Sequence, residues 1–273
     1  MKLKTINLFF FSLILILSLF SCDLFDYHPL HNRAYMMGGK ELNAKNENEI
    51  WFSHHYGLDT ISFVFMGDTH NDYTITKQFV KHINERKEGI DFVIHAGDLT
   101  DFGHRKEYQK FYDIFSKLEI PYIVLAGNHD LLNYGRFNYQ EMFGDTNFSL
   151  FVGNLNFIFL NTNMLCGNEY DEFIDYAWTT NEWAHTYRNI FVMHSPPYSE
   201  QFNDTTTIDR FGDVLTNFSG PVLFCLYGHV HKYSRDDFYN TGIMFYGCDN
   251  IAKRTYLLFT VTANEYKYEL VEF

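Results

Sequence analysis

Five short blocks of this sequence place an Asp, Asn or His beside a small turn residue or a proline, and each block follows an apolar run. Carboxylate and amide oxygens together with imidazole nitrogens, without a thiolate, suit Mn, Fe, Zn, Ni or Mg better than a soft metal. Their number suffices for two metal ions at one edge of a sheet, an arrangement that can split a phosphate ester. The blocks are Gly67-Asp68-Thr69-His70, Gly97-Asp98-Leu99-Thr100-Asp101, Gly127-Asn128-His129-Asp130, Met193-His194-Ser195-Pro196 and Gly228-His229-Val230-His231.

The elements that must position these side chains follow from the apolar runs. Short apolar runs bounded by turn residues predict buried strands at residues 61–66, 92–96 and 122–126. Helical periodicity predicts helices between them, at residues 74–88 and 104–118. This alternation implies parallel strands joined by right-handed crossovers. Because the carboxyl ends of parallel strands converge on one crevice, we expect the first three blocks to meet there.

The second half of the chain has a different pattern. Gly153-Asn154 joins two apolar runs, which predicts a hairpin of residues 148–152 and 155–160. A helix is expected over residues 171–187, followed by strands at 189–193 and 222–226. Four later runs predict an antiparallel meander at residues 233–239, 243–246, 255–261 and 267–271. The whole pattern fits an α/β fold, a four-layer α/β/β/α sandwich of two mixed sheets flanked by helices.

The series D-x-H, G-D-x-x-D, G-N-H-D, H and G-H-x-H, in this order, resembles the calcineurin-like metallophosphoesterase family over residues 61–231. The resemblance implies two divalent metal ions whose bound hydroxide attacks phosphorus. It implies that His129 is the general acid at the leaving group, and that Asp101 orients its ring and keeps it protonated. In this family the first ion would be held by Asp68, His70 and His231, the second by Asn128, His194 and His229, and Asp98 would bridge them.

One position departs from the serine/threonine protein phosphatase branch of that family. That branch continues its second motif with Arg-Gly, and this chain has Phe102-Gly103 instead. The remaining branches include phosphomonoesterases and phosphodiesterases, and the motifs do not choose among them. An alternative is a non-catalytic metal-binding or interaction protein on the same fold. The presence of His129 and Asp101 argues against it, since neither is needed to hold metal.

The composition limits the partners. The chain has 273 residues and a formal charge of −13, enough for one large domain with a core. So acidic a protein repels polyanions at long range, which makes nucleic acid an unlikely main partner. A small phosphate ester remains compatible, because bound metals reverse the charge locally.

The first residues predict export. Residues 6–20 are almost wholly apolar and follow Lys2 and Lys4, but they are too short to span a bilayer. Leu19-Phe20-Ser21-Cys22 resembles the lipobox of bacterial lipoproteins, in which the Cys is acylated. We therefore expect a signal peptide at 1–21, a lipid-anchored tether and lead-in at 22–60, and the metallophosphoesterase domain at 61–273. The expected location is the cell envelope, on a membrane and facing outside the cytoplasm.

One histidine and several aromatic residues near the blocks also need an interpretation. His95 lies within an apolar strand and is expected to be a hydrogen-bonded core histidine. The aromatic residues Tyr134, Phe137 and Tyr139 follow the third block and either wall a substrate cleft, with Arg136 reaching a phosphate, or pack within their loop. The same alternatives hold for Tyr198 and Phe202.

Overall fold

The computed structural model describes residues 41–54, 60–163, 174–183, 188–217 and 220–273. Every element below belongs to one compact unit within residues 36–273. The expected signal peptide and Cys22 lie outside the described residues. Within the part of the chain that is described, no helix is both long enough and apolar enough to cross a membrane.

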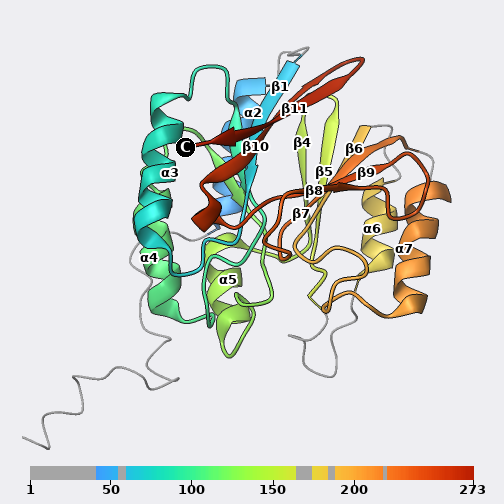
Figure 1. Cartoon of the computed structure of the whole chain (residues 1–273), viewed down its shortest axis with the longest axis horizontal. Helices are drawn as coiled ribbons and strands as arrows, with labels where there is room; N and C mark the ends of the chain where they lie inside the picture. The colour runs from blue at the N-terminus through green and yellow to red at the C-terminus, as the bar shows by residue number, and fades with distance from the viewer. Residues whose placement is uncertain (1–40, 55–59, 164–173, 184–187, 218–219) are drawn as a thin grey trace, which may run out of the picture. The chain divides into compact units, whose positions relative to one another are not determined.

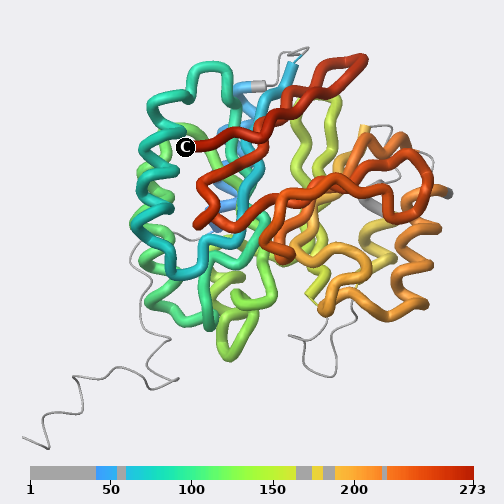
Figure 2. The backbone as a smooth tube through the Cα atoms, viewed as in Figure 1, coloured from blue at the N-terminus to red at the C-terminus, as the bar shows by residue number. Residues whose placement is uncertain are grey.

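The first sheet has the strand order β11-β10-β1-β2-β3. Its three neighbouring strands β1, β2 and β3 are parallel, and β10 runs antiparallel to β1. In Figure 2 the red C-terminal segment accordingly runs beside the blue strand β1. The bounds are β1 Thr60–Met66, β2 Phe92–His95, β3 Tyr122–Val124, β10 Thr255–Thr262 and β11 Tyr266–Glu272.

The second sheet has the order β4-β5-β6-β7-β9-β8. Strands β4 and β5 form the predicted hairpin, and β5, β6, β7 and β9 are parallel to one another. The bounds are β4 Phe148–Val152, β5 Leu155–Leu160, β6 Arg188–Met193, β7 Val222–Tyr227, β8 Ser234–Asp236 and β9 Met244–Gly247.

Three apolar clusters show that these elements form four layers. Alternate residues of β1 point to opposite faces, so Val64 and Met66 pack under helices, while Phe63 and Phe65 lie between the two sheets. A third cluster joins the outer face of the second sheet to its own helices. Figure 1 shows α3 and α4 on one side of the sheets and α6 and α7 on the other. The predicted four-layer α/β/β/α sandwich is confirmed. The helices are α2 Leu42–His54, α3 Tyr73–Glu85, α4 Arg105–Phe115, α5 Gly135–Phe143, α6 Tyr176–Trp183 and α7 Thr205–Asn217.

The predicted C-terminal meander is correct for the antiparallel pairs β8–β9 and β10–β11 but wrong as one continuous sheet. Strands β8 and β9 belong to the second sheet, where β9 extends the parallel series beside β7. Strands β10 and β11 cross to the first sheet and cover its edge at β1. The physical reason is that β1 would otherwise be an open edge between two apolar clusters, and β10 supplies both its hydrogen bonds and apolar side chains.

Helix α2 lies in the segment expected to be tether and lead-in, and the sequence did not predict it. Ile50 is fully buried between the sheets. The Asn43 side chain donates to the Val124 carbonyl at 2.8 Å and accepts from the Val124 N–H at 2.9 Å. Because β3 is the edge strand of its sheet, this amide completes backbone hydrogen bonds that the sheet leaves open.

Candidate metal centre

The ends of five parallel strands place the predicted ligands in one region. Asp68 and His70 follow β1, Asp98 follows β2 and Asn128 follows β3, all in the first sheet. His194 follows β6, and the pair His229 and His231 follows β7, in the second sheet. The seven residues thus come from the carboxyl ends of strands in both sheets, the position at which open α/β sheets collect functional groups.

The backbone at these strand ends is unusual. Five of the ten non-glycine residues with positive φ in the described part of the chain belong to the site. Such left-handed conformations cost free energy for residues other than glycine, and they concentrate at sites where a side chain must be aimed. Here they turn the side chains sharply back toward the strand ends. The five residues are Asp68, His70, Asp98, His229 and His231, with φ of 53°, 44°, 56°, 66° and 56°.

Gly127 is required by the closeness of two of these turns. A Cβ at this position would lie 2.1 Å from Asp98 Oδ1 and 2.3 Å from the Asp98 amide nitrogen. Any side chain here would therefore displace Asp98, the residue that lies between the two groups of ligands described next.

The first group consists of Asp68, His70, Asp98 and His231. The Nε2 atoms of His70 and His231 lie 3.4 Å apart, and His231 Nε2 is 3.3 Å from Asp68 Oδ1. Two nitrogens that bind one ion at about 2.1 Å each are separated by a similar distance. The His70 and His231 side chains are 18% and 42% exposed, so this group opens to solvent.

The second group consists of Asp98, His194 and His229, and Asn128 faces the same point. Asn128 Oδ1 lies 3.0 Å from His194 Nε2 and 3.1 Å from His229 Nδ1. Asp98 Oδ2 is 3.2 Å from His194 Nε2 and 3.8 Å from His70 Nε2. Asp98 is therefore common to both groups, as a bridging ligand must be.

The polar atoms fit divalent cations. Asp68 Oδ2 is buried without a hydrogen-bond partner, which is costly for a carboxylate oxygen unless a cation satisfies it. His194 Nδ1 lies 2.8 Å from the Ala96 carbonyl, and a carbonyl can only accept. When the His194 ring is neutral, its proton therefore lies on Nδ1 and its Nε2 lone pair is directed at the site, the arrangement of metal-binding histidines.

The charges of the second group are strongly coupled. Burial opposes the charged form of His194, but the Asp98 and Asp68 carboxylates outweigh it and raise the pKa of His194 to about 9. Burial likewise opposes ionisation of Asp98, yet His194 and His70 hold the pKa of Asp98 below its usual value. Burial, with the charge of His194, lowers the pKa of His229 to about 4. His194 and Asp98 thus stabilise each other's charged forms, while His229 remains neutral, the form in which histidine binds a metal.

Asp130 organises the turns that carry the ligands. Its carboxylate accepts hydrogen bonds from the backbone N–H groups of Asp98 at 2.8 Å, Thr100 at 2.9 Å and Gly127 at 2.9 Å. It is fully buried and faces the strand turns from below the ligands. Its role is therefore structural.

Comparison with known proteins agrees with this geometry. The sequence model of calcineurin-like phosphoesterases matches residues 61–233, more than half of the chain. The chain belongs to this family. Families of this kind bind divalent metals, and the Asp and His groups above provide a site for them.

Individual relatives point to phosphoesterases. The chain is 43% identical over 51 residues to a probable glycerophosphodiester phosphodiesterase of Arcobacter nitrofigilis, covering 19% of each protein. It is 25% identical over 175 residues to a 3',5'-cyclic-nucleotide phosphodiesterase of Nostoc, covering 59% of this chain and 63% of that protein. The chain thus spans less than two thirds of either relative. A purple acid phosphatase from yellow lupin seeds shares the fold with a TM-score of 0.61 at 16% identity, covering 78% of this chain and 51% of that one.

The contact between Asp101 and His129 differs from the expected one. His129 Nδ1 lies 2.7 Å from the backbone carbonyl of Asp101, not from its carboxylate. That carboxylate instead lies 3.1 Å from His70 Nδ1 as an ion-pair contact and accepts a hydrogen bond from the Asn71 amide. The reason is the turn itself, because Glu107 accepts from the Asp101 N–H at 3.3 Å and holds the carbonyl toward His129.

Glu107 is the supporting residue that the sequence reasoning missed. Its carboxylate also accepts from the N–H groups of Phe102 at 3.2 Å and His104 at 2.8 Å. The available signal was the spacing, since an acid three residues after a helix-capping position is the pattern of a capping box. His104 and Glu107 form such a box at the start of α4.

The remaining histidine and aromatic residues named from the sequence differ in how far they are buried. His95 is a fully buried core histidine, as predicted, with Nε2 at 3.1 Å from Thr69 Oγ1. Tyr139 and Phe202 are buried and belong to the packing. Tyr134, Phe137 and Tyr198 are exposed. For these three residues the interpretation that they wall a substrate cleft stays open.

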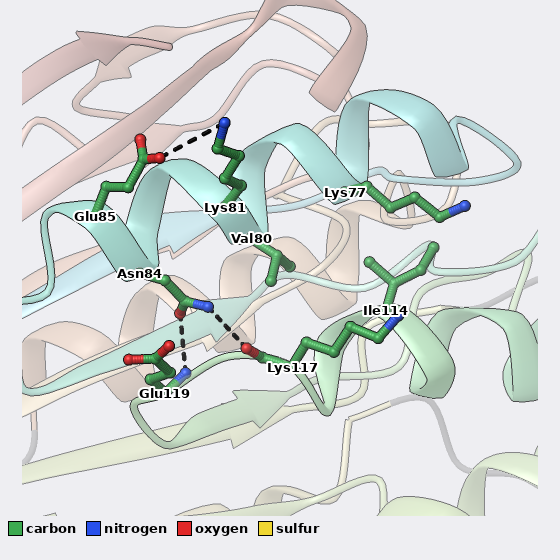
Figure 3. Close-up of a pocket in the computed structure, with 8 residues that line it drawn as sticks. All are labelled: Lys77, Val80, Lys81, Asn84, Glu85, Ile114, Lys117 and Glu119. Atoms are coloured by element: carbon green, nitrogen blue, oxygen red, sulfur yellow. Dashed lines mark hydrogen bonds and ion pairs between the residues drawn. The ribbon is translucent and has the colours of Figure 1, made fainter.

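A cavity of about 510 Å³ lies between α3 and α4, apart from the metal centre. Figure 3 shows Asn84 on α3 reaching toward the segment after α4, where its amide donates to the Lys117 carbonyl and accepts from the Glu119 N–H. None of the lining residues in this described region is one of the proposed ligands. The lining residues are Lys77, Val80, Lys81, Asn84, Glu85, Ile114, Lys117 and Glu119.

Proposed function

We propose that this protein is a dinuclear metal-dependent phosphoesterase that hydrolyses phosphate mono- or diesters. The observation that carries the proposal is the shared position of Asp98. Its carboxylate belongs both to the group with Asp68, His70 and His231 and to the group with His194 and His229. Two ions that share a carboxylate lie close enough to act on one phosphoryl group.

The charge of the site supports a phosphate substrate. Two divalent ions would supply the positive charge that polarises a phosphoryl group and acidifies water. Asp68 and Asp98 neutralise part of that charge and leave a surplus of about +2. This surplus attracts a phosphate despite the negative charge of −13 on the whole chain.

His129 is suited to protonate the leaving group. Its Nδ1 donates to the Asp101 carbonyl, so a second proton resides on Nε2 when the ring is charged. As a water oxygen bonds to phosphorus and the bond to the leaving oxygen breaks, Nε2 transfers its proton to that oxygen. General acids in this role contribute about 10²- to 10⁴-fold to the rate.

The phosphodiesterase names of the two relatives support diesters among the substrates. A panel of substrates tests this directly. The full-length protein, loaded with Mn²⁺, should hydrolyse at least one of an aryl monophosphate, a bis-aryl phosphate, a cyclic nucleotide and a nucleotide sugar, and a chelator should abolish the activity. The same preparation failing on every member of the panel, with two ions bound, would favour the alternative of a non-catalytic metal-binding or interaction protein.

We further propose that the protein is held on a membrane of the cell envelope by a lipid on Cys22, facing outside the cytoplasm. The support is the apolar segment at residues 6–20 and the Leu19-Phe20-Ser21-Cys22 sequence that follows it. Two or more acyl chains suffice for stable anchoring. The partner that we propose for the anchored protein is a small phosphate ester, which is its substrate.

A further inference from the structure

Most of the large apolar side chains that are exposed lie in the segments that carry or follow the proposed metal ligands. Eight such residues are exposed among those the structure describes, and five of them lie in segments that follow the ligand-bearing strands. Trp51, Phe52 and Leu270 lie elsewhere. We call the five the apolar rim: Phe102, Tyr134, Phe137, Tyr198 and Val230, which are 55%, 43%, 62%, 60% and 46% exposed.

Phe102 occupies a fixed position beside the proposed general acid. It directly follows Asp101, whose carbonyl contacts His129 Nδ1 at 2.7 Å. The Phe102 N–H donates to Glu107 at 3.2 Å, and its carbonyl accepts from the Asn133 side chain at 3.1 Å. The ring is therefore held exposed by a rigid turn and does not depend on a flexible loop.

Tyr134 and Phe137 extend the rim on the same side. Their ring centroids are 6.4 Å apart at the start of α5. The turn after Phe102 packs directly on this helix start, because a Cβ at Gly103 would lie 2.8 Å from the Gly135 Cα. Three aromatic rings thus gather on the His129 side of the site.

Val230 and Tyr198 lie in segments that follow strands of the second sheet. Val230 is exposed between the two proposed ligands His229 and His231. Tyr198 follows His194 by four residues in a left-handed conformation with φ of 68°, and its N–H donates to the Phe202 carbonyl at 2.8 Å. The rim therefore draws exposed apolar side chains from segments that follow strands of both sheets.

Exposed apolar groups that border a polar centre are typical of ligand sites, where they bury the uncharged part of a ligand. Provided that the metal centre is the phosphoesterase site proposed above, we propose that its preferred substrates carry an aromatic leaving group that packs against Phe102. The leaving group is assigned to this side because His129, which would protonate it, contacts the residue that precedes Phe102. Exposed aromatic rings provide apolar surface on this side, which favours an uncharged aromatic group.

The test compares two methyl phosphodiesters with leaving groups of similar acidity, one phenyl and one fluorinated alkyl. Matched acidity separates packing from chemical reactivity. With the Mn²⁺-loaded full-length protein, kcat/KM should be about tenfold higher for the phenyl ester, within the range of measured aromatic stacking effects. Phe102→Ala should raise KM for the phenyl ester about five- to tenfold and leave KM for the alkyl ester within about twofold.

Two further variants complete the design. Phe102→Tyr should restore the phenyl preference, and Phe52→Ala, which removes an exposed ring on α2, should change neither KM. Equal effects of Phe102→Ala on both esters, or none, would overturn the role of the rim while the phosphoesterase proposal stands. Hydrolysis of neither ester by the wild-type protein, together with failure on the substrate panel, would overturn both.

Discussion

His129 binds its neighbours through both its backbone and its ring. Its N–H donates to Asp98 Oδ1 at 2.9 Å, and its ring contacts the Asp101 carbonyl. An alanine at this position keeps the backbone contact with the Asp98 carboxylate and loses only the ring. The acid role and the metal-holding role can therefore be separated by one substitution.

We predict that His129→Ala lowers kcat by about 10²- to 10⁴-fold, the contribution of a general acid, while both ions remain bound. Metal content after gel filtration, measured by mass spectrometry alongside kcat, checks this. Asp98→Asn is the matched control and should lose metal together with activity. Turnover unchanged in His129→Ala would remove the histidine from the mechanism.

His95 gives the fold a dependence on pH. Burial lowers its pKa from 6.5 to about 3, so below pH 6.5 the unfolded chain binds a proton here that the folded chain does not. The free energy of unfolding should therefore fall as the pH falls from 6.5 toward 3, by about 1 kcal/mol per pH unit from this residue. Urea unfolding at pH 6.5 and 5, with a chelator present, should show a smaller fall in His95→Gln. An identical fall in both proteins would contradict the assignment.

At the residue level, the types of the site residues could be predicted but not all of their contacts. Seven proposed ligands were recognisable because each lies at a turn after an apolar strand. The partner of His129 was not, because the choice between the Asp101 carboxylate and carbonyl depends on how Glu107 holds the turn. Likewise, Tyr134 and Tyr139 have similar sequence contexts, and only the packing of α5 buries one and exposes the other.

One side chain near the end of α3 makes hydrogen bonds to the segment that follows α4. Asn84 makes two hydrogen bonds to the segment after α4, at 2.8 and 2.9 Å, as Figure 3 shows. We predict that Asn84→Ala lowers the free energy of unfolding by about 1–2 kcal/mol. Lys81→Ala, which removes the exposed pair with Glu85 in the same cavity, should cost less than about 0.5 kcal/mol. Denaturant unfolding compares the two, and equal costs would contradict this role of Asn84.

At the level of elements, the local signals were sufficient for the strands and for helices α3, α4 and α6. Apolar runs predicted β1, β2, β3 and the β4–β5 hairpin because these strands are buried and end at turn residues. Helix α2 was missed because few of its residues are buried, Leu42, Asn43 and Ile50 among them, and these form no broad apolar stripe. The pairing of β10 with β1 joins residues far apart in the sequence, which local patterns do not encode.

The whole molecule combines an acidic chain with an expected membrane anchor. We predict that the full-length protein, produced in a bacterium, fractionates with membranes and that Cys22→Ser shifts it to the soluble fraction, because the acyl chains supply the anchoring free energy. Mass spectrometry of the N-terminal peptide should show the lipid in the wild type only. A Cys22→Ser protein that stays equally membrane-bound would contradict the lipid anchor.

Both proposed metal positions depend on the two sheets together. The first draws Asp68, His70 and Asp98 from one sheet and His231 from the other, and the second joins Asp98 to His194 and His229. Binding of either ion would therefore link the sheets at their carboxyl ends. Only Asp98 serves both positions, so the pairing of the ions depends on this one carboxylate.

Electron paramagnetic resonance during a Mn²⁺ titration tests that pairing most directly. Two ions that share Asp98 should lie about 3.5–4 Å apart and couple magnetically. We predict two Mn²⁺ per chain, the multiline spectrum of a coupled pair, and loss of that spectrum in Asp98→Asn. A wild-type protein that binds a single ion, or two ions that show only isolated Mn²⁺ signals, would contradict the dinuclear site.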